Sequence, residues 1–174
     1  LQQHDPANDA IRVLHHRPSQ PGTLANPSIS SILELDTGDI WLGTREQGID
    51  VLDPKRGVIS SLRPDQQHPG GLGNGMVLSL AQVRDGSVFA GTLAGMFRYR
   101  PASRDFEAID SERGLLGSTV RCLLADPGGD LWIGSNAGLS RWNALTGAVA
   151  TIPVAGGGAL AADVNALALD PDGR

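Results

Sequence analysis

Short apolar runs separated by turn residues dominate this chain. The runs are four to seven residues long, and no stretch keeps an apolar residue at every third or fourth position over ten residues. This pattern predicts β-strands and almost no helix. We therefore expect an all-β chain.

The strand pattern repeats with a period near 45 residues. Segments 28–57, 76–105 and 119–147 align with one another, and a fourth copy begins at Asp163. The turn glycines lie 48, 43 and 44 residues apart, and the glycines inside the second strand lie 48 and 43 apart. The landmarks are the turn residues Gly38, Gly86, Gly129 and Gly173 and the strand residues Gly43, Gly91 and Gly134.

Each repeat predicts four strands. In the first repeat these are 29–35, 39–44, 48–53 and 58–63, and the turn DTGD joins the first two. A glycine in such a turn supplies a positive φ without steric cost. Residues 10–15 (AIRVLH) predict the last strand of a preceding unit.

Four strands in about 45 residues are typical of a β-propeller blade. One four-stranded sheet cannot bury both of its faces alone, so blades stack around a channel. We predict a propeller fragment with three complete four-stranded blades. The predicted division is 1–27 for the last strand of a preceding blade and its connection, 28–63, 75–109 and 118–152 for the blades, and 163–174 for the first strand of a truncated blade.

The residues that recur in the second strand are expected to be scaffold. Large aromatic side chains at equivalent positions would pack between blades, and small glycines would let neighbouring backbones approach closely. The aromatic residues are Trp41, Phe89 and Trp132. The glycines are Gly43, Gly91 and Gly134.

The repeats account for only part of a ring. Propellers typically have four to eight blades, and six or seven blades at this period need roughly 300 residues or more. The chain begins without Met or a signal-peptide pattern and stops at Arg174, before the expected second strand. We expect a piece of a longer protein that joins the remaining blades of the same propeller, with exposed sheet faces able to form a homodimer.

Composition and charge narrow the classes of function. The net charge of −5, with scattered Lys and Arg, argues against a nucleic-acid partner. The chain is 40% hydrophobic and 19% charged, which is unlike a disordered tail. No run approaches the roughly 20 apolar residues of a membrane span, and a single Cys excludes an internal disulfide framework.

The residue pattern predicts no catalytic residues, no metal and no cofactor. His15 and His16 are neighbours on a strand and point to opposite faces, while Cys122 lies in an apolar run where a thiol behaves as a small hydrophobe. A glycosidase needs two carboxylates beside the scissile bond, but the candidate carboxylates recur in every repeat as turn residues. These are Asp36, Asp39, Asp126, Asp130, Asp170 and Asp172.

Ligand binding is expected at one mouth of the channel, where the connections between blades lie beside the turns between second and third strands. The connections are 64–74, 110–118 and 153–162. Arg side chains could hold a carboxylate or stack on a ring, and Gln or Asn could bond sugar hydroxyls; the alternative is that all are solvated loop tips. The candidates are Arg45, Gln47, Gln66, His68, Arg113 and Asn136.

The motif D-x-G-x-[LI]-W-[LI]-G-T-x-x-x-G-[IL], followed by D/N-P-x-x-G, resembles the two-component regulator propeller repeat. The best matches are 37–57 (TGDIWLGTREQGIDVLDPKRG) and 129–147 (GDLWIGSNAGLSRWNALTG). The second repeat departs at Phe89 and Ala90, and the third carries Ser135 in place of Thr. Neither change threatens the fold.

This resemblance implies a periplasmic sensory region in an inner-membrane signalling protein. Such repeats precede a membrane helix and a cytoplasmic output module, commonly a hybrid histidine kinase or a GGDEF-type diguanylate cyclase, and many of the sensors respond to glycan fragments. The unknown periplasmic ligand would then be an oligosaccharide. Two alternatives remain open: a secreted propeller that binds or cleaves glycans, and a scaffold for protein–protein contacts.

Overall fold

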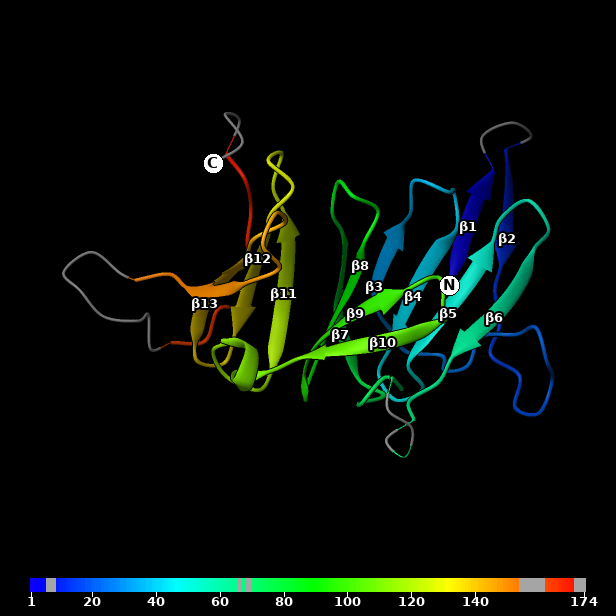
Figure 1. Cartoon of the computed structure of the whole chain (residues 1–174). Coiled ribbons are helices and arrows are strands. Elements are labelled where there is room, and N and C mark those ends of the chain that lie inside the picture. Colours follow the sequence, from blue (N-terminus) through cyan, green and yellow to red (C-terminus); the bar gives the residue numbers. More distant parts are fainter. Residues whose placement is uncertain (6–8, 66, 68–69, 154–161, 171–174) are drawn as a thin grey trace.

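Three four-stranded antiparallel sheets and one hairpin make up the chain (Figure 1). The structure is a computed structural model, and it describes residues 1–5, 9–65, 67, 70–153 and 162–170. Within each sheet every strand pairs with its neighbour in the sequence, because short turns can join antiparallel strands directly. The sheets stand side by side in chain order (Figure 1).

The strand bounds follow the predicted runs closely. The first sheet contains β3 (Ile29–Glu34), β4 (Ile40–Thr44), β5 (Ile49–Asp53) and β6 (Val58–Leu62). The second contains β7 (Val77–Gln82), β8 (Val88–Thr92), β9 (Gly95–Arg100) and β10 (Asp105–Ile109). The third contains β11 (Val120–Ala125), β12 (Leu131–Ser135), β13 (Gly138–Trp142) and β14 (Val149–Thr151).

The N-terminal residues form a hairpin rather than a single strand. The predicted strand is present as β2 (Ala10–Val13), and it pairs with β1 (Gln2–Asp5). The residues of β1 are polar and carry no apolar alternation, so only their pairing with β2 makes them a strand. One 3-10 turn, η1 (Ser111–Arg113), lies between the second and third sheets.

The hydrophobic core lies between sheets, not within one. One cluster includes Trp41 of the first sheet and Phe97 of the second, and the next includes Phe89 of the second sheet and Trp142 of the third. A smaller cluster packs Leu14 and its neighbours against the first sheet. Each sheet therefore covers an apolar face of the next one, as stacking of blades requires.

The aromatic residues of the second strands make these contacts. The ring of Trp41 meets the edge of Tyr99 with centroids 5.0 Å apart, and Phe89 meets Trp142 at 4.8 Å. Both Trp41 and Phe89 are buried. Trp132 differs from them, since it is only half-buried and its described contacts are within its own sheet, to Asp126 and Arg141.

Backbones of neighbouring sheets approach closely at the second-strand glycines. A Cβ placed on Gly43 would lie 2.8 Å from Val77 Cγ1, and one on Gly91 would lie 2.7 Å from Val120 Cγ1. These distances leave no room for a side chain. A glycine is therefore needed where the second strand of one sheet meets the first strand of the next.

The end of the chain differs from its prediction. No strand is assigned in 162–170, and 171–174 lie outside the described residues. A strand requires a ladder of hydrogen bonds to a neighbouring strand, and the backbone bond described for this segment is that of Val164 N to Ser135 O, at 3.0 Å. Val164 nevertheless lies against Gly134, with Val164 Cγ1 2.7 Å from the position of a Cβ. This is the place that Val77 and Val120 take in the earlier repeats.

Candidate functional site

The turns between second and third strands are shaped by one buried hydroxyl in each sheet. Thr44, Thr92 and Ser135 are all buried at the ends of β4, β8 and β12. Each hydroxyl donates to a glycine carbonyl across its turn, at 2.9, 3.0 and 3.1 Å, and each accepts from a backbone N–H of the turn. Ser135 thus keeps both bonds that Thr makes in the other sheets.

These turns are tied to the connections between sheets. Arg45 N donates to Ser28 O at 3.2 Å, and Gly48 N donates to Gly75 O at 2.9 Å. In the third sheet, Asn136 N donates to Thr119 O at 3.0 Å. The turns and the connections therefore lie together on one face of the molecule, and loops on such a rigid scaffold are where ligand sites usually occur.

The two described candidates in the first sheet, Arg45 and Gln47, differ in their side-chain hydrogen bonds. Arg45 is exposed, and its guanidinium forms no hydrogen bond or ion pair with any described residue. Gln47 accepts a hydrogen bond of 3.3 Å from Arg63 Nη1 through its side-chain oxygen. Gln66 and His68 lie outside the described residues.

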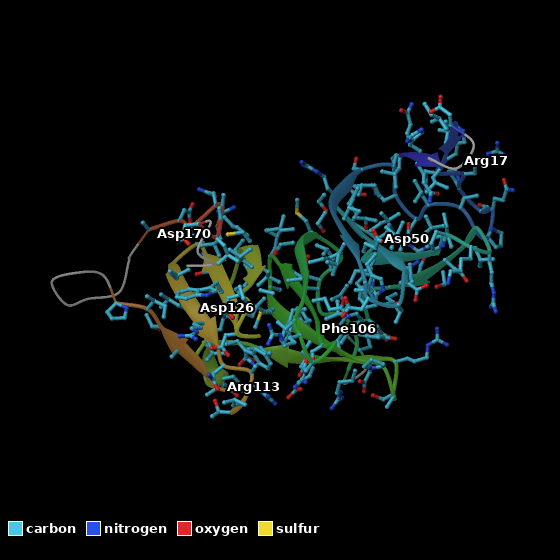
Figure 2. All side chains as sticks on the ribbon, turned by 90° about the horizontal axis from the view of Figure 1, so that it is seen from above. Arg17, Asp50, Phe106, Arg113, Asp126 and Asp170 are labelled. Atoms are coloured by element: carbon cyan, nitrogen blue, oxygen red, sulfur yellow. The ribbon has the colours of Figure 1, made fainter. Side chains whose placement is uncertain are left out.

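The candidates in the other sheets stabilise the fold locally. The side-chain oxygen of Asn136 accepts from the backbone N–H groups of Ser118 and Thr119, each at 3.1 Å. Arg113 forms an ion pair with Glu107. Arg113 lies far from Asp50 (Figure 2), a residue of β5 that follows the turn with Arg45 and Gln47.

A crevice of about 540 Å³ opens between the connection 16–25 and the first sheet, and we call it the first crevice. Residues 16–25 form one wall, with Gln47, Ile59, Ser61 and Arg63 opposite. Its volume is in the range of small-molecule sites. The connection holds its shape through a backbone bond of 3.0 Å from Leu24 N to His15 O and through Thr23, whose hydroxyl bonds to residues 17 and 20.

A buried carboxylate lies behind this crevice. Asp50 is fully buried, and it accepts hydrogen bonds of 2.6 Å from the Ser61 hydroxyl and from Ala25 N. Asp50 and Ser61 are cross-strand partners on β5 and β6. The pair joins the connection to the sheet, which fixes one wall of the crevice against the other.

A second crevice of about 310 Å³ lies between the end of β6, the next connection and the start of β10. It is lined by 61–63, Asp65, 70–72 and 104–106. Arg100 donates two hydrogen bonds of 2.8 Å to Asp105, and these bonds hold the pKa of Asp105 below its ordinary value. Asp105 of this crevice is therefore paired with Arg100 beside it, while Arg63 lines both crevices.

Sequence reasoning did not single out Arg17, Asp50, Ser61 or Arg63. It considered the turns between second and third strands and the connections 64–74, 110–118 and 153–162. Arg17 instead lies in the connection before the first repeat, Asp50 and Ser61 lie within β5 and β6, and Arg63 directly follows β6. A signal was present, because Arg63 follows the fourth strand where the later repeats have Asp110 and Pro153. Departures from the repeat, rather than loop tips, mark the residues that line the first crevice.

The histidine, cysteine and aspartate residues considered above as possible metal ligands or catalytic groups make contacts that stabilise the fold. His16 Nδ1 is 2.6 Å from Leu24 O, and Asp126 accepts from Asp130 N and from the Trp132 ring nitrogen. Burial raises the pKa of the half-buried Cys122 thiol. Among the described residues, no group of three His, Cys, Asp or Glu is placed to hold a metal ion.

Comparison with known proteins identifies the repeat. Residues 114–137 match the two component regulator propeller family. The match covers the connection into the third sheet and continues through β12. The other segment that carries the motif, 37–57, lies outside the matched residues. No curated protein matches the sequence.

Solved structures with the same fold include extracellular domains described as parts of hybrid two component systems and, in one case, of a one component system. The extracellular domain of one protein of B. thetaiotaomicron, described as a hybrid two component system, is 21% identical with a TM-score of 0.69, over 84% of this chain and 19% of that one. A second such domain from B. thetaiotaomicron is 25% identical with a TM-score of 0.68, over 89% of this chain and 20% of that one. Another structure from this organism, also an extracellular domain, is 19% identical with a TM-score of 0.73, over 99% and 22%.

These likenesses confirm the predicted all-β propeller fragment and the resemblance to two component regulator propeller repeats. The chain spans about a fifth of the length of these solved chains. In the part of the chain that the structure describes, no helix is long and apolar enough to cross a membrane.

Proposed function

We propose that this chain is a non-catalytic sensory segment of a β-propeller in a bacterial membrane-bound signalling protein. The observation that carries the proposal is the match of residues 114–137 to the two component regulator propeller family. The likeness to extracellular domains described as parts of two component systems supports it. The segment would lie in the periplasm, on the outer side of the inner membrane.

In this function the propeller binds a periplasmic ligand, which we take to be an oligosaccharide. Binding would shift an equilibrium between two states of the protein, and the bound state would be read by a cytoplasmic histidine kinase or diguanylate cyclase. The connections and turns described above offer hydrogen-bonding side chains on a rigid sheet scaffold, which suits ligand recognition. The remaining blades of the ring would supply the other walls of the channel mouth.

The test is the coding sequence on both sides of this segment. We expect further propeller repeats, then a stretch of about 20 apolar residues, and then a kinase or cyclase motif. A stop codon soon after the ring is complete, with a signal peptide upstream and no membrane span, would contradict the sensory function. A secreted propeller that binds or cleaves glycans would then be the favoured function.

A further inference from the structure

The connections beside the first and second crevices are built in the same way. Each folds back through an isolated parallel bridge, His16 with Leu24 in one and Pro64 with Leu72 in the other. Both leucines are buried beside the sheet that follows. The repeat therefore builds the same connection twice, and the first crevice lies on the first of these connections.

The two connections and the strands beside them differ at equivalent positions. Arg17 of the first connection corresponds to Asp65 of the second, 48 residues later. The cross-strand pair Asp50 and Ser61 corresponds to Phe97 and Ala108, as the strand registers show. Repetition marks the scaffold, and these departures place Arg17 and Ser61 in the lining of the first crevice.

The two arginines of the first crevice have no carboxylate partner among the described residues. Arg17 Nη1 is 3.4 Å from the Gln20 side-chain oxygen, and Arg63 Nη1 is 3.3 Å from that of Gln47. Both partners are neutral and both bonds are long. In the second crevice Arg100 instead donates to Asp105 at 2.8 Å through two nitrogens.

The buried carboxylate behind the crevice has partners of its own. Asp50 is fully buried, and its two oxygens already accept bonds from Ser61 and from Ala25 N. None of the residues that line the first crevice is Asp or Glu, although Arg63 also lines the second crevice, which contains Asp65 and Asp105. A ligand entering the first crevice therefore meets two guanidinium groups that form no ion pair with a described residue.

We propose that the first crevice binds a sugar that carries a negatively charged carboxylate or sulfate group, held by Arg17 and Arg63. A guanidinium presents several N–H donors in a planar fork that matches such oxyanions. Gln47 and Thr23 line the same crevice and carry neutral hydrogen-bonding groups, which suit sugar hydroxyls. The volume of about 540 Å³ accommodates a small saccharide. The sugar part of this assignment rests on the proposed sensory function.

The test is calorimetric titration of the 174-residue chain with three matched probes at up to about 10 mM. D-glucuronate carries a carboxylate, glucose 6-sulfate carries a sulfate, and glucose carries neither. We expect saturable binding of one or both charged sugars, weakened by added salt, and no comparable binding of glucose. The two charged probes distinguish the carboxylate from the sulfate as the recognised group.

Variants locate the site. Arg17→Gln and Arg63→Gln should each weaken binding of the charged sugar by about tenfold or more, while Arg104→Gln, in the second crevice, should not. Circular dichroism and melting of each variant verify that it folds. No saturable binding of either charged sugar, equal binding of glucose, or unchanged binding by Arg17→Gln would overturn the assignment, since Arg17 lines the first crevice and not the second. The sensory function is tested separately, by the coding sequence beyond this segment.

Discussion

At the residue scale, polar side chains hold turns in place by bonding to the backbone. Asp130 is a buried example at the start of β12. Its carboxylate accepts a 2.7 Å hydrogen bond from Ala144 N, with further contacts to Asn143 and Arg141. The backbone bond is the main reason that the pKa of Asp130 is lowered, and the charge of Arg141 adds to it.

This lowered pKa predicts an acid-dependent stability. A carboxylate with a lower pKa in the folded state stabilises the protein above its unfolded pKa of about 4, and this stability is lost as the pH falls through the folded value. Asp130→Asn should lower the free energy of unfolding by about 1–3 kcal/mol at pH 7. The difference from the native chain should shrink steadily in urea unfolding curves recorded below about pH 4.

Asp36→Asn is the matched control for Asp130. The Asp36 carboxylate accepts no hydrogen bond from a described residue, so this variant should differ from the native chain by less than about 0.5 kcal/mol at neutral pH. A difference for Asp130→Asn that stays constant from pH 7 to pH 2 would contradict the role of its charge.

At the element scale, the spacing between neighbouring sheets depends on the second-strand glycines. In β8, a Cβ on Gly91 would lie 2.5 Å from Ser79 Oγ and 2.7 Å from Val120 Cγ1. Ser79 belongs to the same sheet and Val120 to the next. A single added methyl group would therefore clash with a side chain of its own sheet and with a side chain of the next sheet.

Gly91→Ala should destabilise the chain by about 1–3 kcal/mol through overpacking. Gly128→Ala is the control, because a Cβ there would meet only the Asp126 side chain, at 3.1 Å. We expect it to cost less than about 1 kcal/mol. Urea unfolding of both variants measures the difference, and equal losses for the two would show that close packing of the sheets is not the cause.

At the scale of the whole molecule, the face of the third sheet that carries Trp132 is less covered than the equivalent face of the second sheet. Phe89 and Met96 of the second sheet are fully buried by the third sheet. Their equivalents in the third sheet, Trp132 and Leu139, are only half-buried. Arg141 lies over Trp132 at 5.4 Å from the ring centroid, much as Arg98 lies at 6.0 Å from the centroid of Phe89. Arg98 and Phe89 of the second sheet are both in contact with Trp142 of the third sheet.

This open face predicts that the 174-residue chain self-associates. Light scattering should show species larger than a monomer at high concentration, since apolar surface is covered by association. Trp132→Gln should shift the distribution toward monomer. Leu145→Gln is the control, because Leu145 is 95% exposed and lies away from this face, in the turn after β13. A clean monomer for the native chain at high concentration would contradict the prediction.

The repeat in the sequence determined the fold class, the four strands of each sheet and the turns between them. It could do so because apolar runs, turn glycines and their spacing are local features of the chain. It also singled out Trp41, Phe89 and Gly91, since residues that recur at one place in every repeat meet the same environment. The polar strand β1 escaped prediction, because its only signal is its pairing with β2.

The tertiary structure alone decided which polar residues come together. Arg17, Asp50 and Arg63 are far apart in sequence, and they meet around the first crevice because a connection folds back on the outer strands of the following sheet. The same folding places Asn136 and Arg113 in local bonds that hold turns. Residue type determines what a side chain can bind, whereas the packing of one sheet against a connection determines whether it is free to do so.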